Sequence, residues 1–320
     1  MRIISCDGGG IRGVLTARFL FRLEEAVLGF LERAELVAGT STGSIVAICL
    51  AMDIPPSEIV NLFYDLGPKV FKDRDILDGI TRGADELFRA DFSSEPLKAA
   101  MEEVFGAKTR LGDLKKKVLI PSFDLDNQDA ESRAKATRVY KARFWKPKYM
   151  HNFEGGGSDC NVLAVDAAMR SSSAPTYFPS YQGYVDGGVV DNNPSMSALA
   201  KAMKRDNRLS AHTLLSVGTG FNPHYIAGDN LDWGLKQWLT GKRLLNMLFD
   251  GMLGVPHYQC AQMLNEHYRR LDATLPEIID LADISKMDDL VQIADGVNIV
   301  ETVDWLRNTW MAVGEGEVSS

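Results

Sequence analysis

The first fifty residues repeat one pattern, in which an apolar segment is followed by a glycine-rich turn and an apolar helix. Residues 2–6 form the first predicted strand, residues 7–13 its turn, and residues 14–31 a helix with apolar side chains at helical spacing. A second predicted strand at residues 35–38 and a second turn at residues 39–43 precede a buried helix. Strands joined through a helix in this way lie parallel, with a right-handed crossover. The pattern therefore predicts an α/β fold.

The alternation of predicted strands and helices continues to about residue 220, and the pattern after residue 231 is mostly helical. Later strands are predicted at residues 117–123, 137–144 and 213–217. We expect a three-layer α/β fold, in which a mainly parallel sheet carries helices on both faces. No Pro- or Ser-rich linker divides the chain, so residues 1–320 are assigned to one domain. Its core motifs occupy residues 1–220, and residues 231–320 add a helical C-terminal layer.

The charge balance and the apolar runs argue against several classes of protein. The chain has 35 Lys and Arg against 43 Asp and Glu, and the net charge of −8 argues against a broad face for a nucleic-acid polymer. The longest apolar run, residues 45–52, is far shorter than the roughly 18 residues that suggest a membrane span. The chain enters a strand at Arg2, which leaves no room for a signal peptide. We therefore expect a cytoplasmic protein.

The segment Gly39-Thr40-Ser41-Thr42-Gly43 is a G-x-S-x-G sequence between a predicted strand and a predicted buried helix. In a sharp strand-to-helix turn the serine hydroxyl projects from the end of the sheet, and flanking glycines keep the turn free of side-chain clashes. The helix N-terminus also stabilises negative charge that develops there. A glycine-bounded turn without chemistry is the alternative, but the strand before Ser41 and the apolar helix after it favour a nucleophile.

A second glycine turn, residues 7–13 (DGGGIRG), follows the first predicted strand. Consecutive glycines expose backbone amides that can hold an anion. The spacing of Gly8, Gly10 and Gly13 also fits the G-x-G-x-x-G fingerprint of dinucleotide-binding proteins. That site needs an acidic residue at the end of the second strand, where the serine turn stands instead. Because both turns lie at the carboxyl ends of parallel strands, an oxyanion hole facing Ser41 is favoured.

A nucleophilic serine needs a general base, and the residues leave two kinds open. One is a histidine, and the chain has five: His151, His212, His224, His257 and His267. None of them stands in a distinctive motif, although a Ser–Asp–His triad could be assembled with one of the last four. The other is Asp186, which lies in a glycine turn after Tyr184-Val185. A carboxylate can act directly as the base where a dry pocket raises its pKa.

Two other segments carry weaker signals. Residues 124–135 partly match a calcium-binding loop, but Asp129 stands where the loop needs glycine and Lys135 where it needs glutamate. A solvated loop is therefore expected there. Apolar side chains at helical spacing across residues 231–251 form a stripe that basic residues interrupt. The stripe favours a core-facing helix, and a movable amphipathic segment that contacts lipid is the alternative.

Taken together, these motifs resemble the patatin-like phospholipases. The motifs that carry the resemblance stand in the family's order: residues 7–13 (DGGGIRG), 39–43 (GTSTG), 172–179 (SSAPTYFP), 186–188 (DGG) and 192–194 (NNP). The segments 118–124 (VLIPSFD) and 215–220 (LSVGTG) are also similar to that family, and 288–293 (DDLVQI) more weakly so. The resemblance extends from Met1 to about Gly220.

The resemblance implies a Ser–Asp dyad that needs no histidine, metal or cofactor. The roles it implies are Ser41 as the acyl nucleophile, Asp186 as its base, Gly8, Gly9 and Gly10 as the oxyanion hole, and Arg12 as a support for that loop. The substrates would be acyl esters of phospholipids or lysophospholipids. They would be reached by transient contact with the inner face of the membrane.

The family's bacterial members include stand-alone lipases, secreted toxins, and effectors that cyclic nucleotides switch on in anti-phage operons. The short chain fits the last group, which would imply a cyclic-nucleotide activator and is compatible with a homo-oligomer. Two alternatives remain from the residues themselves. One is a dinucleotide-binding protein that uses the loop from Gly8 to Gly13, and the other is a catalytically silent lipid-binding protein.

Overall fold

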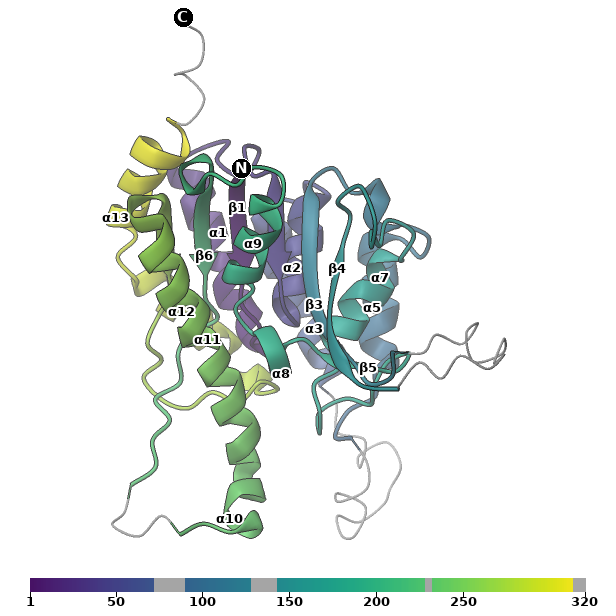
Figure 1. Ribbon diagram of the computed structural model, residues 1–320. Helices are drawn as coiled ribbons and strands as arrows, with labels where there is room; N and C mark the ends of the chain where they lie inside the picture. Colours follow the sequence, from purple (N-terminus) through teal and green to yellow (C-terminus); the bar gives the residue numbers. More distant parts are fainter. Residues whose placement is uncertain (72–89, 128–142, 228–231, 313–320) are drawn as a thin grey trace, which may run out of the picture.

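The computed structural model describes residues 1–71, 90–127, 143–227 and 232–312 (Figure 1). Its described strands form one mixed sheet in the order β4-β3-β2-β1-β6-β7, with β5 paired to β3. The pairs β1–β2, β1–β6, β2–β3 and β6–β7 are parallel, and β4 and β5 run antiparallel to β3. The strands are β1 (Arg2–Cys6), β2 (Leu36–Gly39), β3 (Lys117–Asp124), β4 (Lys146–His151), β5 (Tyr184–Asp186), β6 (Thr213–Val217) and β7 (Tyr268–Leu271).

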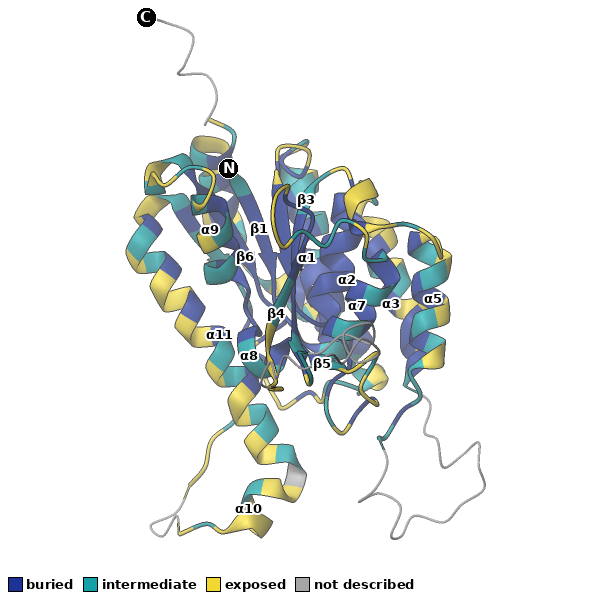
Figure 2. Cartoon of the chain, turned by 45° about the vertical axis from the view of Figure 1, so that its right-hand side comes forward, coloured by how far each residue is buried: buried dark blue, intermediate teal, exposed yellow. Residues whose placement is uncertain are grey.

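Helices cover both faces of this sheet (Figure 2). Side chains alternate along a strand, so Ile4 and Cys6 of β1 join one hydrophobic core while Ile3 joins the other. The first core is closed by α1 (Gly13–Ala26), α2 (Thr42–Ala51), α3 (Pro56–Val70), α5 (Glu95–Phe105), α7 (Ala164–Ser171), α12 (Met287–Gly296) and α13 (Val300–Trp305). The second core is closed by α9 (Ser195–Met203) and α11 (Arg243–Leu264). The predicted three-layer α/β fold is confirmed.

The part of the chain after residue 231 adds a strand as well as helices. There, α10 (Leu235–Leu239) and α11 lead into β7, which lies parallel to β6 at the edge of the sheet. The strand β7 was not predicted from the sequence, because two arginines occupy its centre and interrupt any apolar run. Arg269 bonds Glu301, and Arg270 turns toward Asp7, so both charges have partners.

The strand predicted at residues 137–144 lies largely outside the described residues, as does much of the calcium-like loop. The chain re-enters the sheet slightly later, as β4. Among the described helices, none is long and apolar enough to cross a bilayer.

Candidate active site

Ser41 occupies a strained turn between β2 and α2. Its backbone has φ of 53° and ψ of −126°, a region that residues other than glycine rarely adopt, at a cost on the order of 1–3 kcal/mol. The two flanking glycines make the turn sterically feasible. A Cβ on Gly39 would lie 2.0 Å from the Gly43 carbonyl oxygen, and a Cβ on Gly43 would lie 2.3 Å from the Cys6 carbonyl oxygen. The Ser41 amide donates to the Ser171 hydroxyl at 2.9 Å, which fixes the turn.

The edges of β3 explain why Asp186 lies beside this turn. On one edge, β4 pairs with β3 from Leu119 to Asp124. On the other edge, β2 pairs only from Lys117 to Leu119, because β2 ends at the serine turn. The short strand β5 occupies the part of this edge that β2 leaves free, and places Asp186 opposite Ser122. Asp186 is thereby held just beyond the end of β2, where Ser41 stands.

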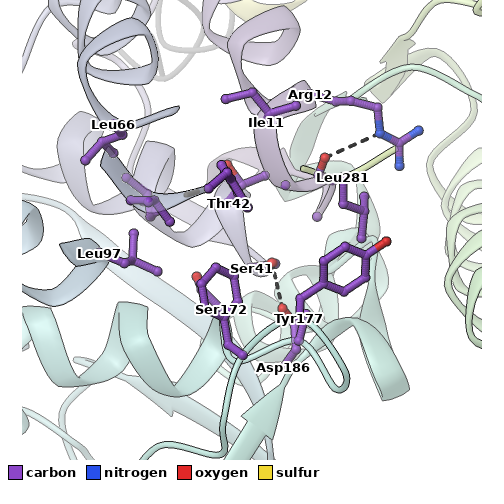
Figure 3. A pocket seen from close by; sticks show the side chains of 18 of the residues that line it. Ile11, Arg12, Ser41, Thr42, Leu66, Leu97, Ser172, Tyr177, Asp186 and Leu281 are labelled. Carbon is purple, nitrogen blue, oxygen red and sulfur yellow. Dashed lines mark hydrogen bonds between the residues drawn. The ribbon is translucent and has the colours of Figure 1, made fainter. Parts of the chain in front are cut away.

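The two side chains are in direct contact, as Figure 3 shows. Ser41 Oγ donates a hydrogen bond of 2.7 Å to Asp186 Oδ2, and the Gly188 amide donates one of 2.7 Å to Oδ1. Burial raises the pKa of Asp186 to about 7, an effect that the hydrogen bonds from Ser41 and Gly188 oppose. A carboxylate whose pKa lies near neutrality can both accept a proton and return it.

The histidines lie elsewhere. All five fall within the described ranges, and none of them hydrogen-bonds Ser41 or Asp186 or lines their cavity. Their partners are Lys201 for His151, Asp206 for His212, Asp250 for His224, Tyr268 for His257 and Thr213 for His267. The structure thus brings Ser41 to a carboxylate and to no imidazole.

The glycine loop presents two free amides to the cavity. The Gly8 amide donates to the Asn192 carbonyl at 3.0 Å, and the Ile11 amide donates to the Leu281 carbonyl at 2.8 Å. Between them, the amides of Gly9 and Gly10 have no acceptor among the residues that the structure describes. Of the three predicted oxyanion-hole glycines, Gly8 therefore contributes to the wall of the site while its amide is already engaged.

Two side chains fix the direction of these free amides. Thr219 Oγ1 donates to the Gly8 carbonyl at 2.9 Å, and Arg12 Nε donates to the Gly9 carbonyl at 3.3 Å. In a trans peptide the carbonyl and the following amide point in opposite directions. Anchoring the two carbonyls therefore directs the Gly9 and Gly10 amides away from Thr219 and Arg12. Thr219 lies in the segment 215–220 that resembles the family, but nothing in the sequence indicated this role for it.

A buried network of charged side chains also holds the glycine loop in place. Asp7 is fully buried and contacts Arg270 of β7 at 2.5 Å, and Arg270 also contacts Asp272 at 2.6 Å. Asp272 in turn accepts from the Gly220 amide at 2.9 Å, which ties down the turn that carries Thr219. The unpredicted strand β7 is thus part of the framework of the site.

An apolar cavity extends from Ser41 and Asp186 between α2, α3 and α5. Its polar end holds the glycine loop and the Ser41–Asp186 pair, and most of its wall is apolar. The apolar lining residues include Ile11, Ile45, Phe63, Leu66, Val70, Phe71, Leu97, Ala174, Tyr177, Phe178, Phe249 and Leu281. Such a lining suits a hydrocarbon chain whose reactive end reaches the serine.

A serine bonded to a buried carboxylate at the end of a parallel strand, beside an apolar cavity, is an arrangement suited to the hydrolysis of lipid esters. The chain belongs to the patatin-like phospholipase family, whose sequence profile matches residues 4–199, and the predicted family is confirmed. It is a lipid ester hydrolase of that family.

Two bacterial relatives are 28% and 29% identical to the chain. CotR of Bacillus subtilis is 28% identical over 97% of this chain and 98% of that protein. A cGAMP-activated phospholipase of Escherichia coli is 29% identical over 77% of this chain and 70% of that protein. Among solved structures, VipD from Legionella pneumophila covers 92% of this chain and 66% of that one, with a TM-score of 0.42 and 11% identity.

Proposed function

We propose that the protein hydrolyses the acyl esters of phospholipids or lysophospholipids through Ser41 and Asp186. The observation that carries the proposal is the 2.7 Å hydrogen bond between Ser41 Oγ and a buried carboxylate at the end of an apolar cavity. Ser41 Oγ attacks the ester carbonyl while Asp186 takes its proton, and Asp186 then returns that proton to the departing alcohol. Water, deprotonated by Asp186, hydrolyses the acyl-enzyme and releases the fatty acid.

We assign the oxyanion hole to the amides of Gly9 and Gly10. Both are without an acceptor in the described chain and both lie on the loop that lines the Ser41 cavity. Arg12 and Thr219 act as positioning residues, because they hold the carbonyls that precede these amides. This geometry also weighs against the dinucleotide alternative, since the loop faces a serine and the Gly8 amide is engaged.

Gly10→Ala should lower kcat by about 10²- to 10³-fold and change KM little, because the displaced amide meets the oxyanion mainly in the transition state. Gly10 has φ of 57°, and an added Cβ would lie 2.3 Å from the Leu281 carbonyl oxygen. Steady-state kinetics on a soluble ester measure both constants. Gly156→Ala is the matched control, since its Cβ would meet nothing within 4 Å. A rise in KM at unchanged kcat would instead indicate that the loop binds a ground-state anion.

Product analysis on a defined phospholipid panel tests the reaction type. Mass spectrometry should find free fatty acid together with lysophospholipid, in equal amounts at early times. Release of diacylglycerol or phosphatidic acid would contradict the proposal, because those products come from cleavage at the phosphate rather than at the acyl ester. Recovery of intact lipid would support the silent lipid-binding alternative.

We further propose that a cyclic nucleotide activates the enzyme, as in an anti-phage effector. The support is the similarity to the cGAMP-activated phospholipases of Escherichia coli, Pseudomonas aeruginosa and Vibrio cholerae, at 28% to 29% identity. Running the phospholipid panel with and without cGAMP tests this step. Equal rates with and without cGAMP would contradict activation by this nucleotide and would leave the hydrolase assignment unaffected.

The surface formed by α10 and the first half of α11 is suited to lipid contact. It projects from the body of the molecule (Figure 2) and exposes apolar side chains, among them Leu235, Leu239, Met247 and Leu248. Basic residues flank them, which favours an anionic membrane surface. The next residue after Leu248, Phe249, is buried and lines the Ser41 cavity. We propose that this α10–α11 surface touches the membrane, next to the cavity that receives the acyl chain.

Replacing Leu235 and Leu239 together with serine should slow vesicle hydrolysis roughly tenfold while a short-chain soluble ester is cleaved normally. The two side chains are 75% and 58% exposed, so their loss removes membrane contact without opening the core. Leu28→Ser is the matched control, because Leu28 is 79% exposed after α1. Equal losses on vesicles and soluble ester, with a lowered melting temperature, would show that the segment is needed for folding instead.

A further inference from the structure

A second, polar cavity adjoins the apolar cavity at Ser41. Arg12, Phe249 and Leu281 line both cavities. The other lining residues are mainly polar: Asn222, His224, Asn246, Asp250 and Asp280, with Ile278 and Ile279. A molecule whose ester lies at Ser41 can therefore extend an apolar part into one cavity and a polar part into the other. The charged side chains that line the second cavity indicate which polar group it can bind.

Arg12 supplies the positive charge of the second cavity. Its side chain is 5% exposed, and its Nε and Nη1 atoms donate to the carbonyls of Gly9 and Gly220. The Nη2 atom has no acceptor within the described residues, yet it is not enclosed by protein, so it reaches the cavity surface. This is a buried guanidinium with one donor left for a ligand. A phosphate oxygen is a suitable acceptor for it.

Two carboxylates stand near the same guanidinium. Burial lowers the pKa of Arg12, and the nearby carboxylates of Asp250, Asp272 and Asp280 oppose this effect. Of these three, Asp250 and Asp280 line the second cavity. Asp280 accepts from the Tyr177 hydroxyl at 2.8 Å and from the Ala282 amide at 3.0 Å. Both of those donors are neutral, so the charge of Asp280 is not cancelled by them. Asp250 Oδ2 lies 2.9 Å from His224 Nδ1. Two carboxylates facing one guanidinium favour a ligand that carries a cation as well as an anion.

We propose that this second cavity binds the headgroup of a zwitterionic phospholipid, with its phosphate at Arg12 and its ammonium group at Asp250 and Asp280. The inference rests on the proposed function. If the scissile ester lies at Ser41, the headgroup of the same lipid can reach past the shared lining residues into the second cavity. A glycerol headgroup would bring the same phosphate without an ammonium group. It would bring an anion toward Asp250 and Asp280 without a cation of its own to offset their repulsion, which is unfavourable.

Competition between two lipids in one sample tests the headgroup site. Mixed micelles would hold equal amounts of phosphatidylethanolamine and phosphatidylglycerol with identical acyl chains. Mass spectrometry of the two lysolipids gives the ratio of their kcat/KM values. The wild-type protein should favour the ethanolamine lipid about tenfold, as expected for one hydrogen bond between charged groups. Because both lipids compete for one enzyme, a general loss of activity leaves this ratio unchanged.

Asp250→Asn and Asp280→Asn should each bring the ratio close to one, since they keep the side-chain shape and remove the charge. Asp304→Asn is the control, because Asp304 is exposed on α13 and should keep the wild-type ratio. Two variants guard against misfolding of either one, which melting temperatures would reveal. If both lipids are cleaved equally, or if folded Asp variants keep the wild-type ratio, the headgroup site is wrong and the hydrolase assignment stands. If neither lipid is cleaved, the proposed function fails and the headgroup site falls with it.

Discussion

Replacing Ser41 with alanine should slow phospholipid hydrolysis by about four to six powers of ten, because the acyl-enzyme can no longer form. The fold should persist, since within the described ranges the Ser41 hydroxyl makes a single hydrogen bond, to Asp186, and the strained turn is held by glycines and by the backbone amide. Rates of fatty-acid release and the melting temperature measure the two effects separately.

Ser172→Ala provides the matched comparison for this variant. Ser172 lines the same cavity, and its buried hydroxyl has no partner among the described residues, so it has no base to activate it. Its loss should reduce the rate by no more than about tenfold. Ser41→Ala protein that kept activity within tenfold of the wild type would overturn the assignment of Ser41 as nucleophile.

Asp186→Asn should be almost as damaging as Ser41→Ala, whereas alanine at any one of the five histidines should leave activity within about tenfold of wild type. Asparagine keeps the shape of the side chain, but its amide offers one acceptor oxygen where Asp186 accepts from both Ser41 and Gly188, and it cannot take the proton. The described structure places every histidine away from the Ser41 cavity. Steady-state rates on one soluble ester compare all six variants directly.

The pH profile follows from the same carboxylate. Burial raises the pKa of Asp186 to about 7, and only its ionised form can accept the Ser41 proton. Activity should therefore fall as the pH drops through about 7 and level off above it. A histidine base would titrate in the same range, so the pH profile alone does not identify the base. A histidine variant as inactive as Ser41→Ala, alongside a less damaged Asp186→Asn, would establish a triad.

The sequence was most informative where function depends on local turn geometry. The G-x-S-x-G segment predicted the strand–turn–helix at Ser41, because glycines at both flanks and an apolar helix behind them leave few other conformations. The pairing with Asp186 was different. The two residues are 145 positions apart, and their contact depends on β5 occupying the part of the β3 edge that β2 leaves free. Sequence spacing alone did not decide whether Asp186 or a histidine is the general base. The family resemblance favoured Asp186.

Features that depend on long-range packing were not accessible from the sequence. Nothing local indicates that the Gly8 amide bonds Asn192, or that Thr219 anchors the Gly8 carbonyl. A structural role for Arg270 could not be recognised from the sequence, because that role depends on its ion pair with Asp7, which lies 263 positions away. The apolar stripe in residues 231–251 favoured a core-facing helix, but several of its side chains lie outside the core. In the structure Phe249 enters the cavity, while Leu235 and Leu239 face solvent.

Covalent labelling with a fluorophosphonate tests the central claim most directly, because the probe reacts with a serine only when that serine is activated. Peptide mass spectrometry of the labelled protein should find one phosphonyl adduct, on Ser41. Phospholipid micelles should slow the labelling, and Asp186→Asn should abolish it. Phospholipid hydrolysis that proceeds without any adduct on Ser41, or with the adduct on another serine, would contradict the account.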